Sequence, residues 1–209
     1  MKIAVIGTGH VGGTLGSRWA RQGHQVVFGT RNPESVKVQE LLEISGNQAG
    51  AEGLKEAADE ADVVVIAVPW SVTQATIEAL GDLRGKIVVD CTNPIAPGLQ
   101  LAMGTTTSGG EQVADWAKGA RVVKAFNSTG WENMANPLYQ GEPTLMLICG
   151  DDEQAKAVVS QLTEALGFAA VDLGPLSAAR LLEPFALVWI RLAVVQGLGR
   201  DFSFKLVKR

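Results

Sequence analysis

A glycine-rich turn between an expected strand and an expected helix constrains the fold more than any other feature of this sequence. Residues Lys2–Ile6 form a short apolar run, of the kind that makes a strand buried on both faces. The turn Gly7–Gly12 (GTGHVG) follows at once, then a helical pattern, and then a second apolar run at Gln25–Phe28. The G-x-G-x-x-G spacing inside a strand–helix–strand unit predicts a dinucleotide-binding site.

Each glycine of this turn has an expected role. Gly7 allows a tight bend, and Gly9 lets the backbone approach a pyrophosphate. Gly12 lets the helix pack closely against the first strand. The N–H groups at the start of that helix then face the anion.

The residues after the second expected strand indicate which dinucleotide binds. NAD enzymes usually place an acid there to bind the ribose 2′-hydroxyl, but here the chain reads Gly29-Thr30-Arg31-Asn32-Pro33. A hydroxyl and a guanidinium bind a 2′-phosphate, which an acid would repel. Asn32 and Pro33 also resemble an N-cap and a first helical residue, which would aim a second helix at that phosphate. The sequence therefore favours NADP over NAD.

Alternating strand and helix patterns along the chain predict an α/β fold. We expect a Rossmann-type, doubly wound, mostly parallel sheet with a C-terminal helical extension. Residues 1–209 read as one domain, with a strand–helix extension over about residues 144–209. Capping patterns at Ser71–Gln74 and Asp151–Gln154 predict two helix starts, and Ile95–Gly110 reads as a loop.

The net charge and the composition of the chain argue against several classes of binding partner. A net charge of −4 and 19% charged residues give no reason to expect nucleic acid or an anionic membrane surface. The most apolar long stretch, residues 181–198, contains Glu183, Pro184 and Arg191, so it reads as a buried or interface helix. With only Cys91 and Cys149, the chain is expected to be a cytoplasmic protein with reduced thiols.

The ligand crevice of an open α/β sheet lies outside the carboxyl ends of its strands. Those ends carry an apolar pair at Pro69 and Trp70, and amides at Asn93 and Asn127. The residues expected to bind the coenzyme or its redox partner are Gly7, Thr8, Gly9, His10, Val11, Gly12, Thr30, Arg31, Asn32, Val68, Pro69, Trp70, Asn93, Ala125 and Asn127.

No catalytic side chain and no metal site is expected. The two histidines lie in or near the first strand–helix–strand unit, and no Cys/His cluster has metal-ligand spacing. Lys124 ends a buried strand, and a structural role is favoured for it. Hydride transfer between two cofactors requires that the protein orient the two cofactors, and it requires no acid or base from the protein. A chain without an evident catalytic side chain therefore suits a protein that transfers hydride between two cofactors.

The sequence resembles the coenzyme F420-dependent NADP oxidoreductase family. The blocks that carry the resemblance are the first thirty-three residues, AVPW, and CGDDEQAKAVVSQLTEALGFAAVDLGPLSAARLLEP, and they extend it over essentially the whole chain. It implies a small Rossmann homodimer that passes hydride between NADPH and a deazaflavin. It implies NADP contacts at Gly7, Thr8, Gly9, Gly12, Thr30, Arg31, Pro69 and Trp70, and C-terminal helices that serve the dimer interface.

Residues 124–131, KAFNSTGW, depart from the His-Thr-Ile-Pro-type segment that archaeal F420 enzymes carry at this place. The first four of these residues, KAFN, are similar instead to the oxidoreductase domain of the STEAP metalloreductases, which uses NADPH with a flavin. The leading hypothesis is therefore an NADPH-dependent oxidoreductase whose redox partner is F420, FMN or FAD. A reductase of a small imine or carbonyl compound and a non-catalytic dinucleotide-binding partner protein are the alternatives.

Overall fold

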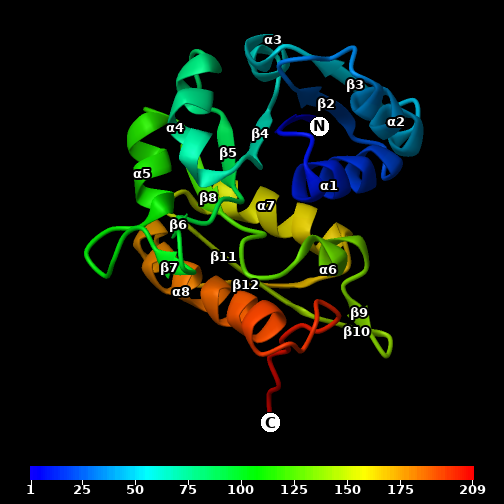
Figure 1. Ribbon diagram of the computed structural model, residues 1–209. Helices are drawn as coiled ribbons and strands as arrows, with labels where there is room; N and C mark the ends of the chain where they lie inside the picture. Colours follow the sequence, from blue (N-terminus) through cyan, green and yellow to red (C-terminus); the bar gives the residue numbers. More distant parts are fainter.

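The computed structural model describes residues 1–209 and has an eight-stranded sheet at its centre, in the order β12-β11-β8-β5-β4-β1-β2-β3 (Figure 1). The strands of this sheet are β1 (Lys2–Ile6), β2 (Gln25–Gly29), β3 (Ala49–Glu52), β4 (Val63–Ile66), β5 (Ile87–Asp90), β8 (Arg121–Lys124), β11 (Leu145–Gly150) and β12 (Ala169–Asp172). Two hairpins complete the strands, β6 (Ile95–Ala96) with β7 (Gln100–Leu101), and β9 (Leu138–Tyr139) with β10 (Glu142–Pro143).

The helices alternate with the strands along most of the chain. They are α1 (His10–Arg21), α2 (Val36–Ser45), α3 (Leu54–Asp59), α4 (Trp70–Ala79), α5 (Gly109–Trp116), α6 (Trp131–Ala135), α7 (Glu153–Ala165) and α8 (Ala179–Ile190). A 3₁₀ turn, Leu176–Ala178, precedes α8, and a π-helical turn, Arg191–Val195, follows it.

The central strands are parallel because their sequences favour burial on both faces. Every residue of β4 (VVVI) and of β5 (IVVD) is buried, and β-branched residues of this kind suit a strand covered by helices on both sides. The pairing of β8 with β11 is antiparallel, whereas the other neighbours in the sheet are parallel. The predicted Rossmann-type, mostly parallel α/β fold is confirmed.

Helices cover both faces of the sheet and make two cores. On one face Leu15 and Trp19 of α1 and Val159 of α7 pack on the strands. On the other face the buried side chains come from α3, α4, α5 and α8, for example Ile77 and Leu182. At the carboxyl edge of the sheet, the residues after β1, β2 and β4 line an open hollow, whereas residues 125–130 after β8 are buried.

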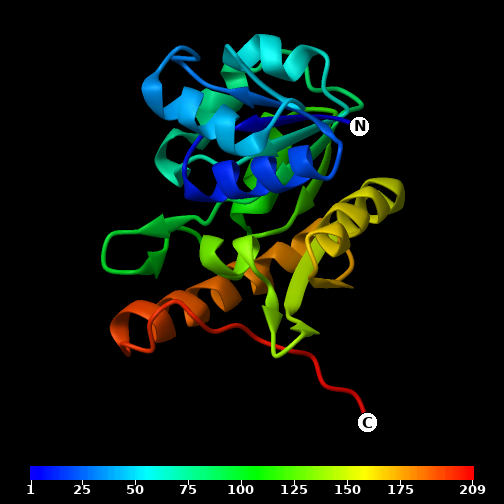
Figure 2. The same cartoon turned by 90° about the vertical axis from the view of Figure 1, so that its right-hand side faces the viewer.

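The C-terminal third of the chain extends the sheet beyond the carboxyl edge of the parallel strands. Only two residue pairs, Cys149 with Lys124 and Gly150 with Val123, join β11 to β8. The first four residues of β11 therefore project beyond the end of β8, where Leu145 N donates to Phe204 O of the C-terminal tail at 2.8 Å. Figure 2 shows β11, α8 and the tail together in the lower half of the molecule, away from β2 and β3.

Three local predictions were wrong. Helix α4 begins at Trp70 after Pro69, and no side chain caps it, so Ser71 and Gln74 form no capping box. The cap of α7 is Asp152, one residue later than predicted, because Asp151 instead accepts from Leu176 N at 2.8 Å. The expected loop 95–110 contains the β6–β7 hairpin.

None of the helices combines the length and the hydropathy that spanning a membrane would require.

Candidate functional site

The turn between β1 and α1 has the geometry that its glycines predict. Gly7 has φ +112°, in the left-handed region that favours glycine. A Cβ on Gly12 would lie 2.0 Å from Gly7 O, so the helix and the turn can approach only with glycine there. A Cβ on Gly9 would meet nothing within 4 Å, so the backbone at that position is open to a ligand.

The start of α1 is suited to an anion. No side chain caps this end of the helix, and no acidic residue lies in its first turn. The first N–H groups of a helix have no partner within it, and they carry a partial positive charge. A pyrophosphate over Gly9 would satisfy them.

A hollow of about 470 Å³ lies on the β2 side of the turn. Thr30 and Arg31 line one wall, and Arg31 forms no ion pair with any residue of the chain. An exposed guanidinium without a carboxylate remains available to a phosphate. Other residues lining the hollow are Gly7, Thr8, Gly9, Gly29, Leu54, Ala67, Val68, Pro69, Val72, Ala75, Thr76 and Ala79.

The predicted second helix start at Asn32 and Pro33 was wrong. Helix α2 begins at Val36, and Ser35 is its N-cap residue. The chain first makes a turn in which Ser35 N donates to Asn32 O at 3.3 Å, and Asn32 N donates to Thr30 Oγ1 at 3.4 Å. Asn32 therefore belongs to the turn beside Arg31 rather than to the end of a helix.

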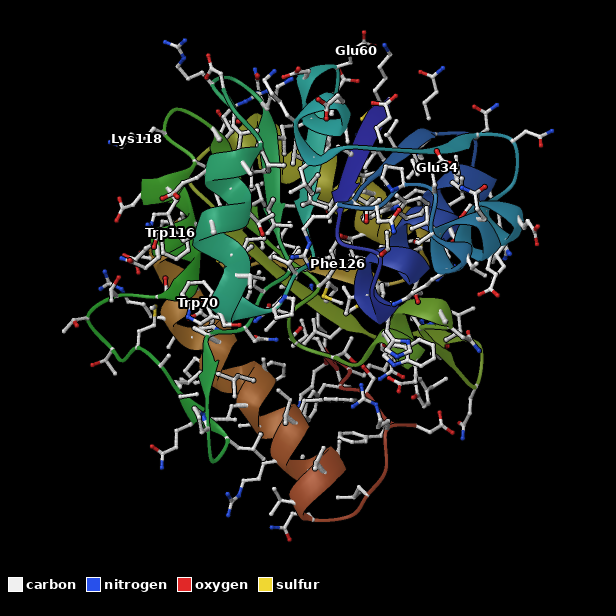
Figure 3. The ribbon with its side chains drawn as sticks, turned by 45° about the horizontal axis from the view of Figure 1, so that its top comes forward. Glu34, Glu60, Trp70, Trp116, Lys118 and Phe126 are labelled. Carbon is white, nitrogen blue, oxygen red and sulfur yellow. The ribbon has the colours of Figure 1, made fainter.

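The opposite wall of the hollow comes from the end of β4 and from α4. Val68 and Pro69 line it, as predicted positions, together with Val72 and Thr76, which the sequence did not single out. Trp70 does not line this hollow and instead packs on Trp116 of α5, with ring centroids 5.3 Å apart (Figure 3). The apolar wall is therefore made by small and β-branched side chains.

The ends of β5 and β8 are tied together by their amides. Asn93 Nδ2 donates to Asn127 O at 3.0 Å, and Asn127 Nδ2 donates to Asn93 Oδ1 at 3.2 Å and to Leu182 O at 3.3 Å. Asn127 Oδ1 is buried and has no partner. Ala125 is fully buried, so its side chain presents no surface to a ligand.

Two aromatic residues shape the same edge. Phe126, labelled near the centre of Figure 3, is buried and has φ +62°, a strained value for an L-residue that turns the chain sharply after β8. Trp131, at the start of α6, stacks on His10 with centroids 4.8 Å apart and an interplanar angle of 17°. This stack joins the glycine turn to α6, and the sequence analysis did not predict it.

Lys124 lies in a buried ionic network, in agreement with the structural role favoured for it. Its Nζ is 2.7 Å from Asp90 Oδ2 and 2.9 Å from Glu183 Oε1, and it donates to Thr92 O at 2.9 Å. Lys124 and Asp90 have no exposed side-chain surface, and that of Glu183 is 3% exposed. The two carboxylates hold the pKa of Lys124 above its usual value against the opposing effect of burial.

Glu183 ties α8 to this network. Its two carboxylate oxygens also accept from Gly109 N and Gly110 N at 2.9 and 3.0 Å, at the start of α5. The sequence signal that could have found this residue is a carboxylate in the most apolar stretch of the chain.

The remaining candidate sites are less suited to binding a metal ion or a dinucleotide. No group of three or more His, Cys, Asp or Glu side chains could hold a metal ion. A larger hollow, of about 660 Å³, lies at the amino ends of β1, β2 and β3, on the edge opposite the glycine turn. Its lining includes the acids Glu52, Glu56, Asp59 and Glu60, which would repel the phosphates of a dinucleotide.

Solved structures show the same fold over the whole chain. A protein of Arthrobacter sp. FB24 assigned as an F420-dependent NADP reductase has a TM-score of 0.90 and 33% identity, and the match covers 100% of both chains. A reductive aminase of Aspergillus terreus, solved with NADPH and ethyl-5-oxohexanoate, has a TM-score of 0.70 at 19% identity, over 94% of this chain and 63% of the aminase. At that identity the likeness concerns the fold alone. The fold and the glycine turn define a Rossmann-type protein of the dinucleotide-binding class.

Sequence relatives then give the family. Residues 2–94 match the family described as NADP oxidoreductase, coenzyme F420-dependent. The F420-dependent NADP reductase of Methanocaldococcus jannaschii is 34% identical in an alignment that covers 93% of each chain. The chain belongs to the F420-dependent NADP oxidoreductase family, and it is an NADP-dependent oxidoreductase.

A more distant similarity also agrees with the sequence analysis. The metalloreductase STEAP3 of Rattus norvegicus is 30% identical over 189 residues, which cover 89% of this chain and 36% of the metalloreductase.

Proposed function

We propose that this protein transfers hydride between NADP(H), bound over the glycine turn, and F420 or a flavin (FMN or FAD) at the ends of β5 and β8. The observation that carries the proposal is the chemical contrast between the two halves of the site. The donor half presents an uncapped helix start and a cation without an ion pair, Arg31. The acceptor half presents the amide of Asn93 and the aromatic ring of Trp131, and Lys124, the ionisable residue that ends β8, is buried there.

The residues of the donor half fit NADP. The open backbone at Gly9 leaves room for the pyrophosphate, and Thr30 and Arg31 offer a hydroxyl and a guanidinium to the 2′-phosphate. Val68, Val72 and Thr76 form the wall against which the adenosine would pack. When bound, NADPH supplies the hydride.

The acceptor half requires no acid or base from the chain in this proposal. Lys124, Asp90 and Glu183 are buried and fully engaged with one another, so none of them reaches a bound ring. The residues at the strand ends would act by holding two rings at reacting distance and excluding water, which alone supplies a large part of the rate. Membership of the F420-dependent family supports F420, and the similarity to a metalloreductase supports a flavin.

The experiment that tests the proposal is a titration of the purified protein with NADPH and NADH, followed by the addition of F420, FMN and FAD in separate assays. Loss of the nicotinamide absorbance with one of these acceptors, and a preference for NADPH over NADH, are expected. NADPH binding without oxidation by any of the three would contradict the proposed acceptor class. Absence of NADPH binding would contradict the donor site as well.

Reduction of a small imine or carbonyl compound is the second candidate, and the exposed imidazole of His10 at the glycine turn is the observation that favours it. This reaction needs a proton donor, and His10 is in a position to act as one, whereas Lys124 has no exposed surface. Turnover with an imine or carbonyl panel that is lost in His10→Gln would support this candidate. Tight NADPH binding with no turnover on any acceptor would favour a non-catalytic binding protein.

We also propose that the protein is a cytoplasmic homodimer that uses the outer face of α8 and the turn after it. Leu181, Val188 and Val195 are exposed there, and Val194 and Leu198 extend the apolar surface. Both cysteines are free and buried, which suits a reducing compartment. Light scattering should give twice the 22.0 kDa of one chain, and Val188→Glu should halve that mass. Val36→Glu, at an exposed valine on α2, is the control, and a wild-type monomer would overturn the dimer.

A further inference from the structure

A second hollow, of about 430 Å³, lies on the other side of the glycine turn from Arg31. It is a groove between α1, α2 and α6, which lie side by side at the right of Figure 1. Thr8, Gly9 and His10 border both this groove and the turn. The polar side chains that line it farther from the turn are Thr14, Ser17, Arg18, Arg21, Lys37 and Glu40.

The cations of this groove have no carboxylate partners. Arg18, Arg21 and Lys37 form no ion pair, whereas Lys55, Lys156 and Arg180 elsewhere in the chain each do. Arg18 Nη1 donates to Met134 O at 2.7 Å, and Arg21 donates to Ile44 O at 2.6 and 2.9 Å. Carbonyl oxygens orient these guanidiniums but do not neutralise them. With Glu40 as the only acid, the groove keeps a positive charge.

Arg18 is a partly buried cation without a carboxylate partner. Partial burial lowers the pKa of its guanidinium, and no nearby carboxylate opposes that effect. An anion in the groove would supply the missing charge and would form charge-assisted hydrogen bonds with the free N–H groups.

The groove also has a direct connection to the acceptor half of the site. Trp131, which stacks on His10, is the first residue of α6, and Ala135, the last residue of α6, lines the groove. At a rise of 1.5 Å per residue, these two positions are about 6 Å apart along the helix. A ring beside Trp131 could therefore extend a chain of a few bonds into the groove.

We infer that the groove binds the anionic tail, phosphate or carboxylate, of the ring that exchanges hydride with NADP(H). The inference rests on the proposed function and adds a recognition site to it. Arg18, Arg21 and Lys37 would bind the tail, while the ring itself lies at the ends of β5 and β8. The groove would bind the phosphate of FMN and the phosphate of a deazaflavin side chain by the same contacts. The assay distinguishes these two acceptors because each is compared with its own ring without a tail.

The test compares acceptors that differ only in the tail. FMN is paired with riboflavin, and F420 is paired with its deazaflavin core lacking the phosphate and the carboxylates. We expect kcat/KM with NADPH to be at least about 10-fold higher for the tailed member of the productive pair, as one charge-assisted contact allows. The variant Arg21→Gln/Lys37→Gln should abolish that preference and leave turnover of the tail-less ring unchanged. Lys118→Gln is the control, at an exposed lysine on the far side of the molecule that also forms no ion pair (Figure 3).

A binding measurement separates this inference from the proposed function. The affinity for FMN and riboflavin is measured by quenching of flavin fluorescence with NADP⁺ present, and the affinity for the F420 pair by quenching of deazaflavin fluorescence. Tighter binding of the tailed ring that disappears in the double variant supports the groove even if no turnover occurs. Equal affinity for both members of each pair overturns it. A loss of NADPH preference over NADH in the double variant also overturns it, because the groove would then bind the 2′-phosphate.

Discussion

The side-chain amide of Asn93 donates to the main-chain oxygen of Asn127 at 3.0 Å, and the side chain of Asn127 donates back to Asn93 Oδ1 at 3.2 Å. This reciprocal pair joins the ends of β5 and β8, the two strand ends at which we propose that the redox acceptor binds. Asn127 Nδ2 also donates to Leu182 O, so the same side chain connects the strand ends to α8. The pair therefore links the strand ends to the C-terminal helix.

Replacement of Asn127 should affect the acceptor and not the coenzyme. Asn127→Ala removes the donor for Asn93 Oδ1 and for Leu182 O, and two neutral hydrogen bonds together contribute about 1–3 kcal/mol. We expect acceptor kcat/KM to fall roughly 5- to 100-fold, with NADPH affinity unchanged. Steady-state kinetics and NADPH titration measure the two quantities. Asn136→Ala is the control, at an exposed asparagine whose side chain accepts only from Leu138 N. Unchanged turnover in Asn127→Ala would refute the placement of the acceptor.

Arg31 should decide the choice of coenzyme. Arg31→Ala removes the guanidinium available to the 2′-phosphate, so NADPH affinity should fall about 10- to 100-fold, as expected for a hydrogen bond to a charged group. NADH affinity should stay the same because its ribose carries no phosphate. Fluorescence titration with both coenzymes gives the ratio. Arg191→Ala is the control, at an exposed arginine on the turn after α8, and an equal loss for both coenzymes would rule out the assigned contact.

A side chain at position 12 should destabilise the protein and weaken NADPH binding. A methyl group there would lie 2.0 Å from Gly7 O, so Gly12→Ala must push α1 away from the turn. Overpacking of this kind costs about 1–3 kcal/mol, and urea denaturation should show that loss together with weaker NADPH binding. Gly104→Ala, where a Cβ meets nothing within 4 Å, should leave both unchanged. A stable Gly12→Ala variant with wild-type NADPH affinity would contradict the close approach.

Lys124 should matter for stability. Lys124→Met leaves the carboxylates of Asp90 and Glu183 buried without their cation, and breaking a buried ion pair costs about 3–5 kcal/mol. The double variant Lys124→Met/Glu183→Gln should recover part of that loss because one uncompensated charge is removed. Urea denaturation of the two variants measures both values. A loss below about 1 kcal/mol in Lys124→Met, the range of exposed pairs, would show that the network contributes little.

The buried cysteines predict a loss of stability in alkali. Burial raises the pKa of Cys149 to about 12 from 9.0, and it also raises the pKa of Cys91. An unfolded thiol loses its proton at a lower pH than the folded one, so the stabilisation is complete below pH 9 and is lost between pH 9 and 12. The free energy of unfolding should fall by about 1.4 kcal/mol per pH unit for each thiol in this window. Urea denaturation at several pH values should show a smaller slope in Cys149→Ala than in the wild type, and equal slopes would contradict the pKa assignment.

The fold was predictable because strong local signals agreed with each other. The buried runs that became β1, β4 and β5 and the glycine turn between β1 and α1 are short-range patterns, and together they determine a parallel sheet. Helix starts were harder to predict, because several residues compete for each cap. Asp151 and Asp152 are equally good caps in sequence, and only the long-range bond from Leu176 N to Asp151 decides between them.

The position of Thr30 and Arg31 beside the glycine turn was predictable, because both residues directly follow β2, which pairs with β1. The site was not predictable where partners come from distant segments. The stack of His10 on Trp131 and the contact of Glu183 with Lys124 depend on how α6 and α8 fold back on the sheet, and no local pattern encodes that. Trp70 shows the reverse case, since it follows β4 closely in the sequence but is the first residue of α4 and packs on Trp116.

Thr8 and Gly9 border both hollows, one on the β2 side and one along α1. Directed evolution of coenzyme preference should therefore avoid this turn, because a change there would alter both of the proposed binding sites at once and confound any screen. Libraries at positions 31, 72 and 76 reach only the hollow on the β2 side, and libraries at positions 21 and 37 reach only the groove. The two specificities of this small protein could thus be engineered in separate campaigns and combined afterwards.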